Sequence, residues 1–188
     1  TNSNIEEERM DNIILGLLLL SSRTIYQLRE RIDKGLNMMY SSSMGSIQAA
    51  IKKLLNCGYI QYEEAVENGK YKKIYSITDS GKRQFIEWVS TPMEIQSCKN
   101  PELAKLYFMG FSTKEKREVG LQEYISKLKE QYDVLNAICK EAENINVPDE
   151  NKDIFYYQLA AARYGKDFMK FNIEWYQKLL DEMRGNKI

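Results

Sequence analysis

Two groups of side chains in this chain could bind phosphate. The first is the run Ser41-Ser42-Ser43, which stands directly before a segment with a helical pattern. Serine hydroxyls and the unpaired N–H groups at a helix start both bind phosphate oxygens. The second group consists of three closely spaced lysines, Lys70, Lys72 and Lys73. Together, the two groups favour contact with the phosphate backbone of a nucleic acid.

The sequence offers little for other kinds of chemistry. It contains no histidine, which removes the commonest general base and the commonest zinc ligand. It also lacks a glycine-rich phosphate loop, metal-ligand spacing and a nucleophile beside a base. The cysteines are too widely spaced for a disulfide framework or a metal site: Cys57, Cys98 and Cys139. We therefore expect no enzyme, no cofactor and no metal, and we expect Cys57 to be buried.

The serines precede the third of three predicted helices. The first covers residues 13–20 and is short and apolar. The second runs from Ile25 to about Lys34, because Thr24 and Gln27 have the spacing of a capping box and Gly35 is a typical stop. The third has apolar residues at the spacing of one helix face: Ile47, Ala50, Ile51, Leu54 and Leu55.

The opposite face of the third helix contains no acidic residue. It carries small, amide and basic side chains, with Ser46 and Gln48 at its edges: Gly45, Ala49, Lys52, Lys53 and Asn56. A helix enters the major groove of DNA only when its outer face is free of negative charge and bulk. This face meets that requirement, although an ordinary solvated face would have a similar composition.

A predicted β-hairpin carries the lysines. Two strand-like runs, residues 59–66 and 71–77, flank an Asn-Gly pair, which is the strongest short signal for a hairpin turn. Thr78 then caps a fourth helix, and Thr91-Pro92 marks a boundary between domains 1–91 and 92–188. The order of three helices, hairpin and helix is typical of a winged helix-turn-helix. The fold class is therefore mainly α with a small β-hairpin wing, followed by a helical domain.

Charge is unevenly distributed along the chain, although the net charge is +0. From Ser22 to Arg83 there are 11 Lys and Arg against 6 Asp and Glu, whereas from Met93 to Ile188 there are 15 against 16. A local basic excess is typical of a nucleic-acid-binding surface. The N-terminus is polar and acidic, and no apolar run reaches the roughly 18 residues of a membrane span. We therefore expect a cytoplasmic protein.

The region from Ile13 to Arg83 resembles the PadR family of transcriptional regulators. Five segments carry the resemblance, and their combination is specific although no single segment is: residues 14–18, 26–28, 44–47, 54–60 and 72–81. The rest of the chain is similar to the family only in its layout. The resemblance implies a dimeric DNA-binding repressor whose helical C-terminal domain dimerises and can sense a small ligand.

The resemblance also implies which residues contact DNA. These belong to the second helix, the start of the third helix and the wing: Tyr26, Ser41, Ser42, Ser43, Met44, Gly45, Ser46, Lys70, Lys72 and Lys73. From the acid-free face of the third helix, we add Gln48 and Lys52 as candidates for DNA contact. Two positions depart from the family pattern. Gln48 stands where tyrosine is usual, and its amide could still read a base, whereas Ile25 stands where glycine is frequent.

The second half of the chain predicts an antiparallel pair of long helices. A helix over residues 101–111 comes first, and the long helices cover about 114–143 and the segment from the turn at 144–148 to about Met183. The first long helix has a heptad seam, which packs either within the chain or against a second copy. Our candidates for dimer contact are Leu121, Ile125, Leu128, Leu135, Phe168 and Trp175.

Aromatic residues recur on one stripe of the last helix. They are Tyr157, Tyr164, Phe168, Phe171 and Trp175. Packing between the long helices is one interpretation, and a pocket for a flat apolar or phenolic effector is the other. Candidates for that pocket are Trp88, Tyr107, Phe108, Phe168 and Trp175. A competing hypothesis for the whole chain is a protein-interaction scaffold without DNA binding, which the basic wing disfavours.

Overall fold

The computed structural model describes residues 2–35, 43–67, 70–93, 100 and 102–185. The chain divides into two compact units, Thr1–Gln96 and Ser97–Ile188. This division falls slightly beyond the predicted boundary at Thr91-Pro92. Each unit has its own hydrophobic core.

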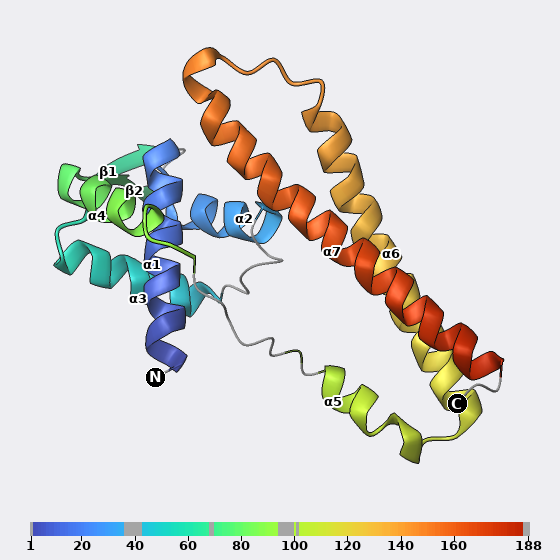
Figure 1. Cartoon of the computed structure of the whole chain (residues 1–188). Coiled ribbons are helices and arrows are strands. Elements are labelled where there is room, and N and C mark those ends of the chain that lie inside the picture. Colours follow the sequence, from blue (N-terminus) through green and yellow to red (C-terminus); the bar gives the residue numbers. More distant parts are fainter. Residues whose placement is uncertain (1, 36–42, 68–69, 94–99, 101, 186–188) are drawn as a thin grey trace. The chain divides into compact units, whose positions relative to one another are not determined.

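The first unit contains four helices and one hairpin among its described residues (Figure 1). They follow in the order α1 (Asn2–Leu20), α2 (Ile25–Gly35), α3 (Met44–Asn56), β1 (Ile60–Glu67), β2 (Lys70–Ile77) and α4 (Asp79–Val89). The two strands pair antiparallel from Ile60 with Ile77 to Glu67 with Lys70. This is the predicted order of a winged helix, with α1 longer than predicted from the apolar run at residues 13–20.

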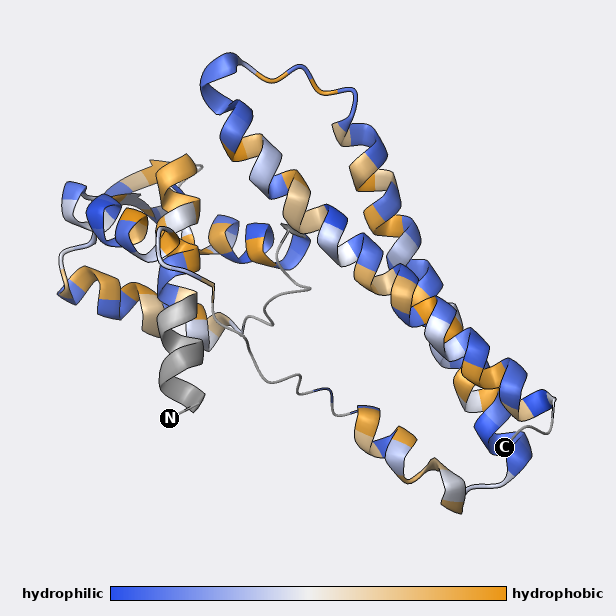
Figure 2. Cartoon of the chain, viewed as in Figure 1, coloured by the Kyte–Doolittle hydropathy of each residue, from blue (hydrophilic) through white to orange (hydrophobic). Residues whose placement is uncertain are grey.

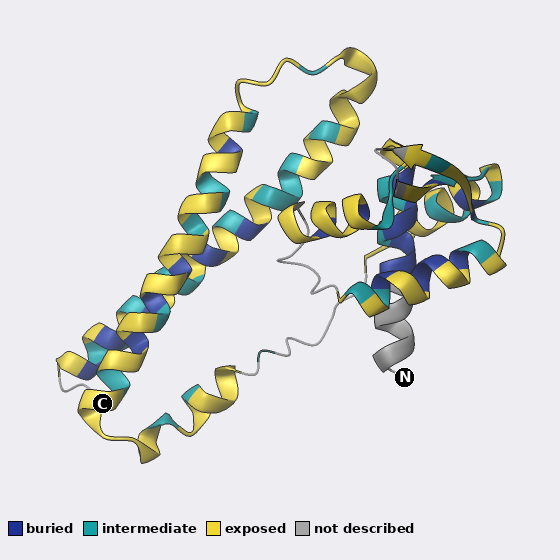
Figure 3. Cartoon of the chain, turned by 180° about the vertical axis from the view of Figure 1, so that it is seen from behind, coloured by how far each residue is buried: buried dark blue, intermediate teal, exposed yellow. Residues whose placement is uncertain are grey.

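The core of the first unit forms around the apolar half of α1. Ile14 and Leu15 are almost completely buried there, against residues of α2, α3 and the hairpin. Figure 3 shows much of this half of α1 in the dark blue of buried residues. From α3 this core receives the predicted apolar stripe, in which Ile47, Ile51 and Leu54 are buried. The alternation of apolar and polar residues along α3 is visible in Figure 2. Because that stripe faces the core, the opposite face of α3 is left for solvent or a partner.

The hairpin and α4 approach each other closely at Gly81. A Cβ at this position would lie 2.1 Å from the carbonyl oxygen of Tyr59, so only glycine fits. The Thr78 side chain caps α4 by accepting a hydrogen bond from the Gly81 N–H. Its hydroxyl also donates to the carbonyl of Gly58 at 2.8 Å, which joins the end of α3 to the start of α4. The wing therefore leaves the core from a fixed base.

The second unit is built on two long antiparallel helices (Figure 1). Its elements are α5 (Glu102–Tyr107), the 3-10 turn η1 (Met109–Phe111), α6 (Lys114–Ala142), η2 (Asp149–Asn151) and α7 (Lys152–Arg184). The prediction of one helix over residues 101–111 was wrong at its end, because the α-helix stops at Tyr107 and a separate turn follows. The two long helices match their predicted ranges within a few residues.

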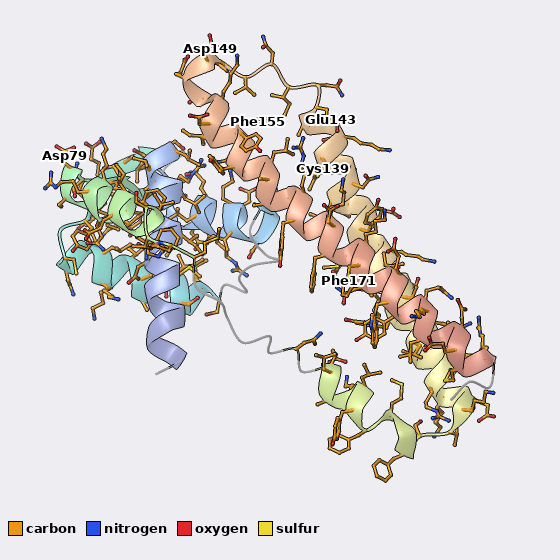
Figure 4. All side chains as sticks on the ribbon, viewed as in Figure 1. Asp79, Cys139, Glu143, Asp149, Phe155 and Phe171 are labelled. Atoms are coloured by element: carbon orange, nitrogen blue, oxygen red, sulfur yellow. The ribbon has the colours of Figure 1, made fainter. Side chains whose placement is uncertain are left out.

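The heptad seam of α6 packs against α7 of the same chain. Leu121, Ile125 and Leu128 are buried with four residues of α7, which are Met169, Tyr176, Leu180 and Met183. The Tyr124 and Tyr176 rings meet edge to face with their centroids 4.8 Å apart. Near the other end of the pair, Cys139 of α6 is buried and Phe155 of α7 is half-buried (Figure 4). Of the two interpretations of the seam, packing within the chain is the one the structure contains.

The aromatic stripe of α7 does not lie in this interface. Tyr164, Phe168, Phe171 and Trp175 are all exposed, and the labelled Phe171 is found midway along α7 in Figure 4. The interpretation that the stripe packs between the long helices was therefore wrong for the single chain. The buried stripe of α7 is an adjacent one, which includes Met169 and Tyr176.

Candidate nucleic-acid interface

The start of α3 is held by a reciprocal pair of serines. Ser43 is the N-cap, and its hydroxyl accepts a hydrogen bond from the Ser46 N–H at 3.1 Å. The Ser46 hydroxyl donates to the Ser43 carbonyl at 2.8 Å. Because these bonds fix the first turn, the helix start is formed before any ligand binds. The other predicted contacts in this run, Ser41 and Ser42, lie outside the described residues.

The outer face of α3 is exposed along its length. Gly45, Gln48, Ala49, Lys52 and Asn56 all belong to it. A Cβ on Gly45 would meet only the Ser43 hydroxyl, at an ordinary contact distance of 3.7 Å. The fold therefore does not require glycine here, and a small residue at this point leaves room for an approaching surface. Met44 and Ser46 are half-buried beside it.

One predicted member of the outer face has a structural partner instead. The Lys53 ammonium forms an ion pair with Asp11 of α1 at 2.6 Å, and the Asp11 side chain is only 10% exposed. The Lys53 side chain therefore joins α3 to α1 at the edge of the hydrophobic core. The sequence pattern did not predict this ion pair, because Asp11 lies in the polar segment that precedes the apolar run of residues 13–20.

The start of α2 has the predicted capping box. The Thr24 N–H donates to the Gln27 side-chain carbonyl at 2.8 Å, and the Gln27 N–H donates to the Thr24 hydroxyl at 3.3 Å. Directly after the cap, Tyr26 is 74% exposed. The described residues therefore leave this ring available to a partner.

A bridge between Arg23 and the wing was not predicted. The Arg23 N–H donates to the Tyr75 carbonyl at 3.0 Å, and the Tyr75 N–H donates to the Arg23 carbonyl at 2.9 Å. Arg23 thus pairs with β2 on the edge that β1 leaves free. The sequence around it, Ser21-Ser22-Arg23, predicted only an interruption, because a bridge of a single residue leaves no periodic pattern. This bridge joins the start of α2 to the base of the wing.

The two strands of the wing carry opposite charges. Three glutamates lie on β1, at positions 63, 64 and 67, whereas the three lysines lie on β2. The pairing places Glu64 opposite Lys73 and Ala65 opposite Lys72. Since neighbouring residues of a strand point to opposite faces, Lys72 and Lys73 lie on different faces of the hairpin. The wing is therefore basic along one strand only.

Lys73 lies over an aromatic ring. Its ammonium is 4.0 Å from the centroid of Tyr62, a cation–π distance. Hydrogen bonding with Tyr62 is the main cause that raises the pKa of Lys73 above its usual value, and the nearby Glu64 carboxylate acts in the same direction. Lys73 is thus fully charged at neutral pH. No sequence pattern indicates a role for Tyr62, because that role depends on the register of the strands.

The predicted effector residues are not brought together within either unit. Trp88 is on α4 of the first unit, whereas Tyr107, Phe108, Phe168 and Trp175 are in the second. Among the described residues, each ring contact of these side chains joins it to a close neighbour in sequence, as in the Tyr107–Phe108 pair at 4.9 Å. A separate groove between α6 and α7 has a mixed lining without aromatic rings: Gln122, Ile125, Ser126, Lys129, Gln177, Leu180 and Arg184.

The predicted dimer residues fall into two groups. Leu121, Ile125 and Leu128 are buried in their own chain, and Leu135 is half-buried. Phe168 and Trp175 are more than two-fifths exposed. Only the second group could provide much apolar surface to another chain without rearrangement.

Cys57 is exposed, so the prediction that it would be buried was wrong. It follows the last turn of α3, beyond the apolar stripe.

The first unit is a winged helix in which a capped, acid-free helix and a lysine-bearing hairpin extend from one core. Residues 14–87 match the model of the PadR-like family of transcriptional regulators, and residues 98–184 match the family described as the C-terminal domain of virulence activator alpha. The chain therefore contains a PadR-like domain over residues 14–87. Of the helices in the described part of the chain, none combines the length and hydrophobicity that a membrane span requires.

Two curated relatives are similar in sequence. The chain is 26% identical over 116 residues to the negative transcriptional regulator PadR of Bacillus subtilis, and the match covers 61% of this chain and 64% of that protein. It is 22% identical over 85 residues to the probable transcriptional regulator Rv1176c of Mycobacterium tuberculosis, where the match covers 45% of each chain. The chain thus spans less than two thirds of either relative.

Solved structures share the fold over most of the chain. Bacillus subtilis PadR in complex with operator DNA has a TM-score of 0.82 at 21% identity, covering 92% of this chain and 96% of that one. The same Bacillus protein in complex with p-coumaric acid has a TM-score of 0.74 at 20% identity, covering 93% and 98%. The virulence activator AphA of Vibrio cholerae has a TM-score of 0.69 at 17% identity, covering 94% and 98%.

Proposed function

We propose that this regulator binds duplex DNA in a sequence-specific manner, with α3 in the major groove and the wing on the adjacent backbone. The observation that carries the proposal is the outer face of α3, which is exposed, contains no carboxylate and presents an amide at Gln48. Gln can read adenine through two hydrogen bonds, and Lys52 supplies positive charge beside it. The solved DNA complex of the Bacillus relative supports the same use of the fold.

The phosphate contacts would come from three places. The capped start of α3 offers free N–H groups near Ser43, Tyr26 offers an exposed hydroxyl at the start of α2, and the lysines of β2 offer charge. The bridge between Arg23 and Tyr75 links the second and third of these places. These phosphate contacts would position the protein on the duplex, and the outer face of α3 would then select the base sequence.

The protein would act as a dimer. One winged helix buries too little surface for the affinity that specific regulators reach. Two copies would read half-sites about 34 Å apart, one turn of the duplex. The exposed aromatic residues of α7, among them Phe168 and Trp175, supply apolar surface for the contact between copies. Residues 92–188 would therefore form the dimerisation domain and residues 1–91 the DNA-binding domain.

The protein would act as a repressor that a small apolar or phenolic effector releases from DNA. The name of the curated Bacillus relative and the p-coumaric acid complex of its structure support this assignment. Release requires an effector that binds better to a dimer whose two recognition helices no longer match the half-site spacing. Exposed aromatic side chains of the second unit, among them Tyr107 and Phe168, would provide the ring contacts.

The experiment that tests the function is selection of binding sites from a random duplex pool, using the full-length protein. We expect an inverted repeat whose half-sites are about one helical turn apart. The affinity for the selected duplex should fall steeply with salt. A protein-interaction scaffold would enrich no sequence and show no salt-dependent binding, and that outcome would contradict the proposal.

A further inference from the structure

The environment of Lys73 differs from that of an ordinary surface lysine. Its ammonium lies 4.0 Å from the centroid of the Tyr62 ring. In the strand register Lys73 is opposite Glu64, and Tyr62 is opposite Tyr75, so Tyr62 is the diagonal neighbour of Lys73 on the same face. The lysine therefore turns toward the base of the wing, across the strand pair.

The ring beneath Lys73 is itself fixed. Its centroid is 5.9 Å from that of Tyr75, at an angle of 57°. Tyr75 is 8% exposed, and its backbone exchanges two hydrogen bonds with Arg23. Tyr62 thus forms the outer member of a series of contacts that begins in the core of the unit. A lysine held by such a ring loses less side-chain freedom when it binds a phosphate than a freely rotating one.

The alternative partner for this lysine is a carboxylate. Glu64 is directly opposite Lys73 on the same face, and an ion pair between them would cancel the charge that attracts a phosphate. Among the salt bridges of the described residues, none joins Lys73 to Glu64, and the ammonium is over the ring instead. A ring attracts the cation through its quadrupole without neutralising it.

We propose that Tyr62 is a positioning residue of the wing, which holds the Lys73 ammonium away from Glu64, fully charged and oriented for a DNA phosphate. The inference rests on the proposed function, because it assumes that Lys73 contacts the backbone of a duplex. In this role Tyr62 would contribute to DNA binding without contacting the DNA itself. It also explains how a hairpin with as many glutamates as lysines can present a basic surface.

A double-mutant cycle in the full-length protein tests the proposal. The probe is a mixed-sequence duplex of about 30 base pairs, long enough for two half-sites, and the readout is its dissociation constant at several salt concentrations. Tyr62→Leu should weaken binding roughly twofold to fivefold for each bound protomer, the strength of an exposed cation–π contact. In a Lys73→Ala background the same change should cause no further loss. Tyr62→Phe keeps the ring and should restore most of the affinity.

Two further variants separate positioning from a general effect on the wing. Glu64→Gln removes the competing carboxylate, so it should improve binding more in the Tyr62→Leu background than in the wild type. Tyr71→Leu is the matched control, because Tyr71 is an exposed tyrosine on the same face of the wing. Any effect of Tyr71→Leu should be equal with and without Lys73. Melting temperatures show whether each variant is folded.

The contact can also be measured without DNA. A ring under the ammonium shifts the NMR signals of the Lys73 side-chain methylene protons upfield, and Tyr62→Leu should abolish the shift. An equal loss of affinity from Tyr62→Leu in both Lys73 backgrounds, or no ring shift in the wild type, would overturn the proposal. If the wild-type protein binds no duplex while the ring shift is present, the proposed DNA-binding function fails and the contact itself remains.

Discussion

Lys53 of α3 and Asp11 of α1 form an ion pair across the edge of the first core, with 2.6 Å between their charged atoms. The neighbouring Lys52 is exposed on the outer face of the same helix. Two adjacent lysines thus differ in their surroundings. Lys53 is paired with Asp11 inside the unit, whereas Lys52 is exposed on the face that we propose for DNA. The pair makes it possible to separate stability from binding within a single turn of α3.

Lys53→Met should destabilise the protein, whereas Lys52→Met should weaken DNA binding. The first change leaves the largely buried Asp11 carboxylate without this cation. Because Lys53 is itself about half exposed, we expect a loss of about 1–2 kcal/mol of unfolding free energy, less than for a fully buried pair. Urea unfolding and duplex titration of both variants provide the measurements. A stable Lys53→Met protein with weak DNA binding would reverse the assignment.

Lys72→Ala and Lys73→Ala should each weaken binding to any duplex. Both lysines are on β2, which is the basic strand of the wing. Each change should lower the slope of log affinity against log salt by about 2 for the proposed dimer, because each protomer loses one phosphate contact. Lys178→Ala is a matched control, since it removes a lysine that pairs with Glu182 in the second unit. Weaker binding with an unchanged slope would mean that these lysines do not contact phosphates.

Gly45→Ala should separate folding from DNA binding. The added Cβ would lie 3.7 Å from the Ser43 hydroxyl and meet no other atom within 4 Å. In a helix, alanine is favoured over glycine by about 1 kcal/mol, so the variant should melt at an equal or higher temperature. Its extra methyl group on the outer face should nevertheless weaken binding to the selected duplex. Gly120→Ala on α6, where an added Cβ meets no atom within 4 Å, should leave DNA affinity as it is.

Gln48→Ala should alter sequence preference more than overall affinity. Gln48 is exposed on the outer face of α3, near its start. Loss of an amide that reads one base reduces the discrimination at that position by about 1–3 kcal/mol. Repeating the site selection with the variant measures this change. Asn56→Ala, at the far end of the same helix, is the comparison; an unchanged profile for Gln48→Ala would remove Gln48 from the reading residues.

Tyr176→Phe should make the second unit more resistant to alkali. Burial raises the pKa of the Tyr176 hydroxyl above its usual value, with the nearby Tyr124 contributing in the same direction. The unfolded chain ionises this tyrosine at a lower pH than the folded chain. The stability that the neutral ring provides is thus complete below about pH 10 and declines as the pH rises further. Phenylalanine removes that decline, which urea unfolding at neutral and alkaline pH would detect.

The exposed Tyr164 provides the control for this comparison. It is 74% exposed on α7, so Tyr164→Phe should leave the alkaline loss of stability as it is in the wild type. If Tyr176→Phe and Tyr164→Phe behave alike, the ionisation of Tyr176 does not limit stability at high pH.

Local features of the first unit were predictable from the sequence. The capping box at Thr24 and the cap Thr78 form as expected, because each depends on residues only a few positions apart. The N-cap Ser43 belongs to the run of serines that stands before the predicted third helix. The apolar stripe of α3 and the pairing of the strands on either side of the Asn-Gly pair followed from short periodic patterns. These elements place the outer face of α3 and the strand of lysines.

Features that depend on long-range contacts were not predictable. The Arg23–Tyr75 bridge and the Lys53–Asp11 pair join residues far apart in the sequence, and neither leaves a periodic pattern. On α7, two neighbouring stripes are both rich in large side chains, and periodicity cannot decide which one is buried. The stripe that includes Tyr176 is the buried one, because α6 packs against it.

The bridge between Arg23 and Tyr75 has a consequence for the selectivity of binding. Since the strand bearing the lysines is hydrogen-bonded to the residue before the α2 cap, the span from Tyr26 to the wing is set in the free protein. A rigid span of this kind accepts only duplexes whose backbone already has, or can cheaply adopt, the matching groove width. Such a regulator would therefore discriminate against stiff, wrongly shaped sites even where every base it reads is correct.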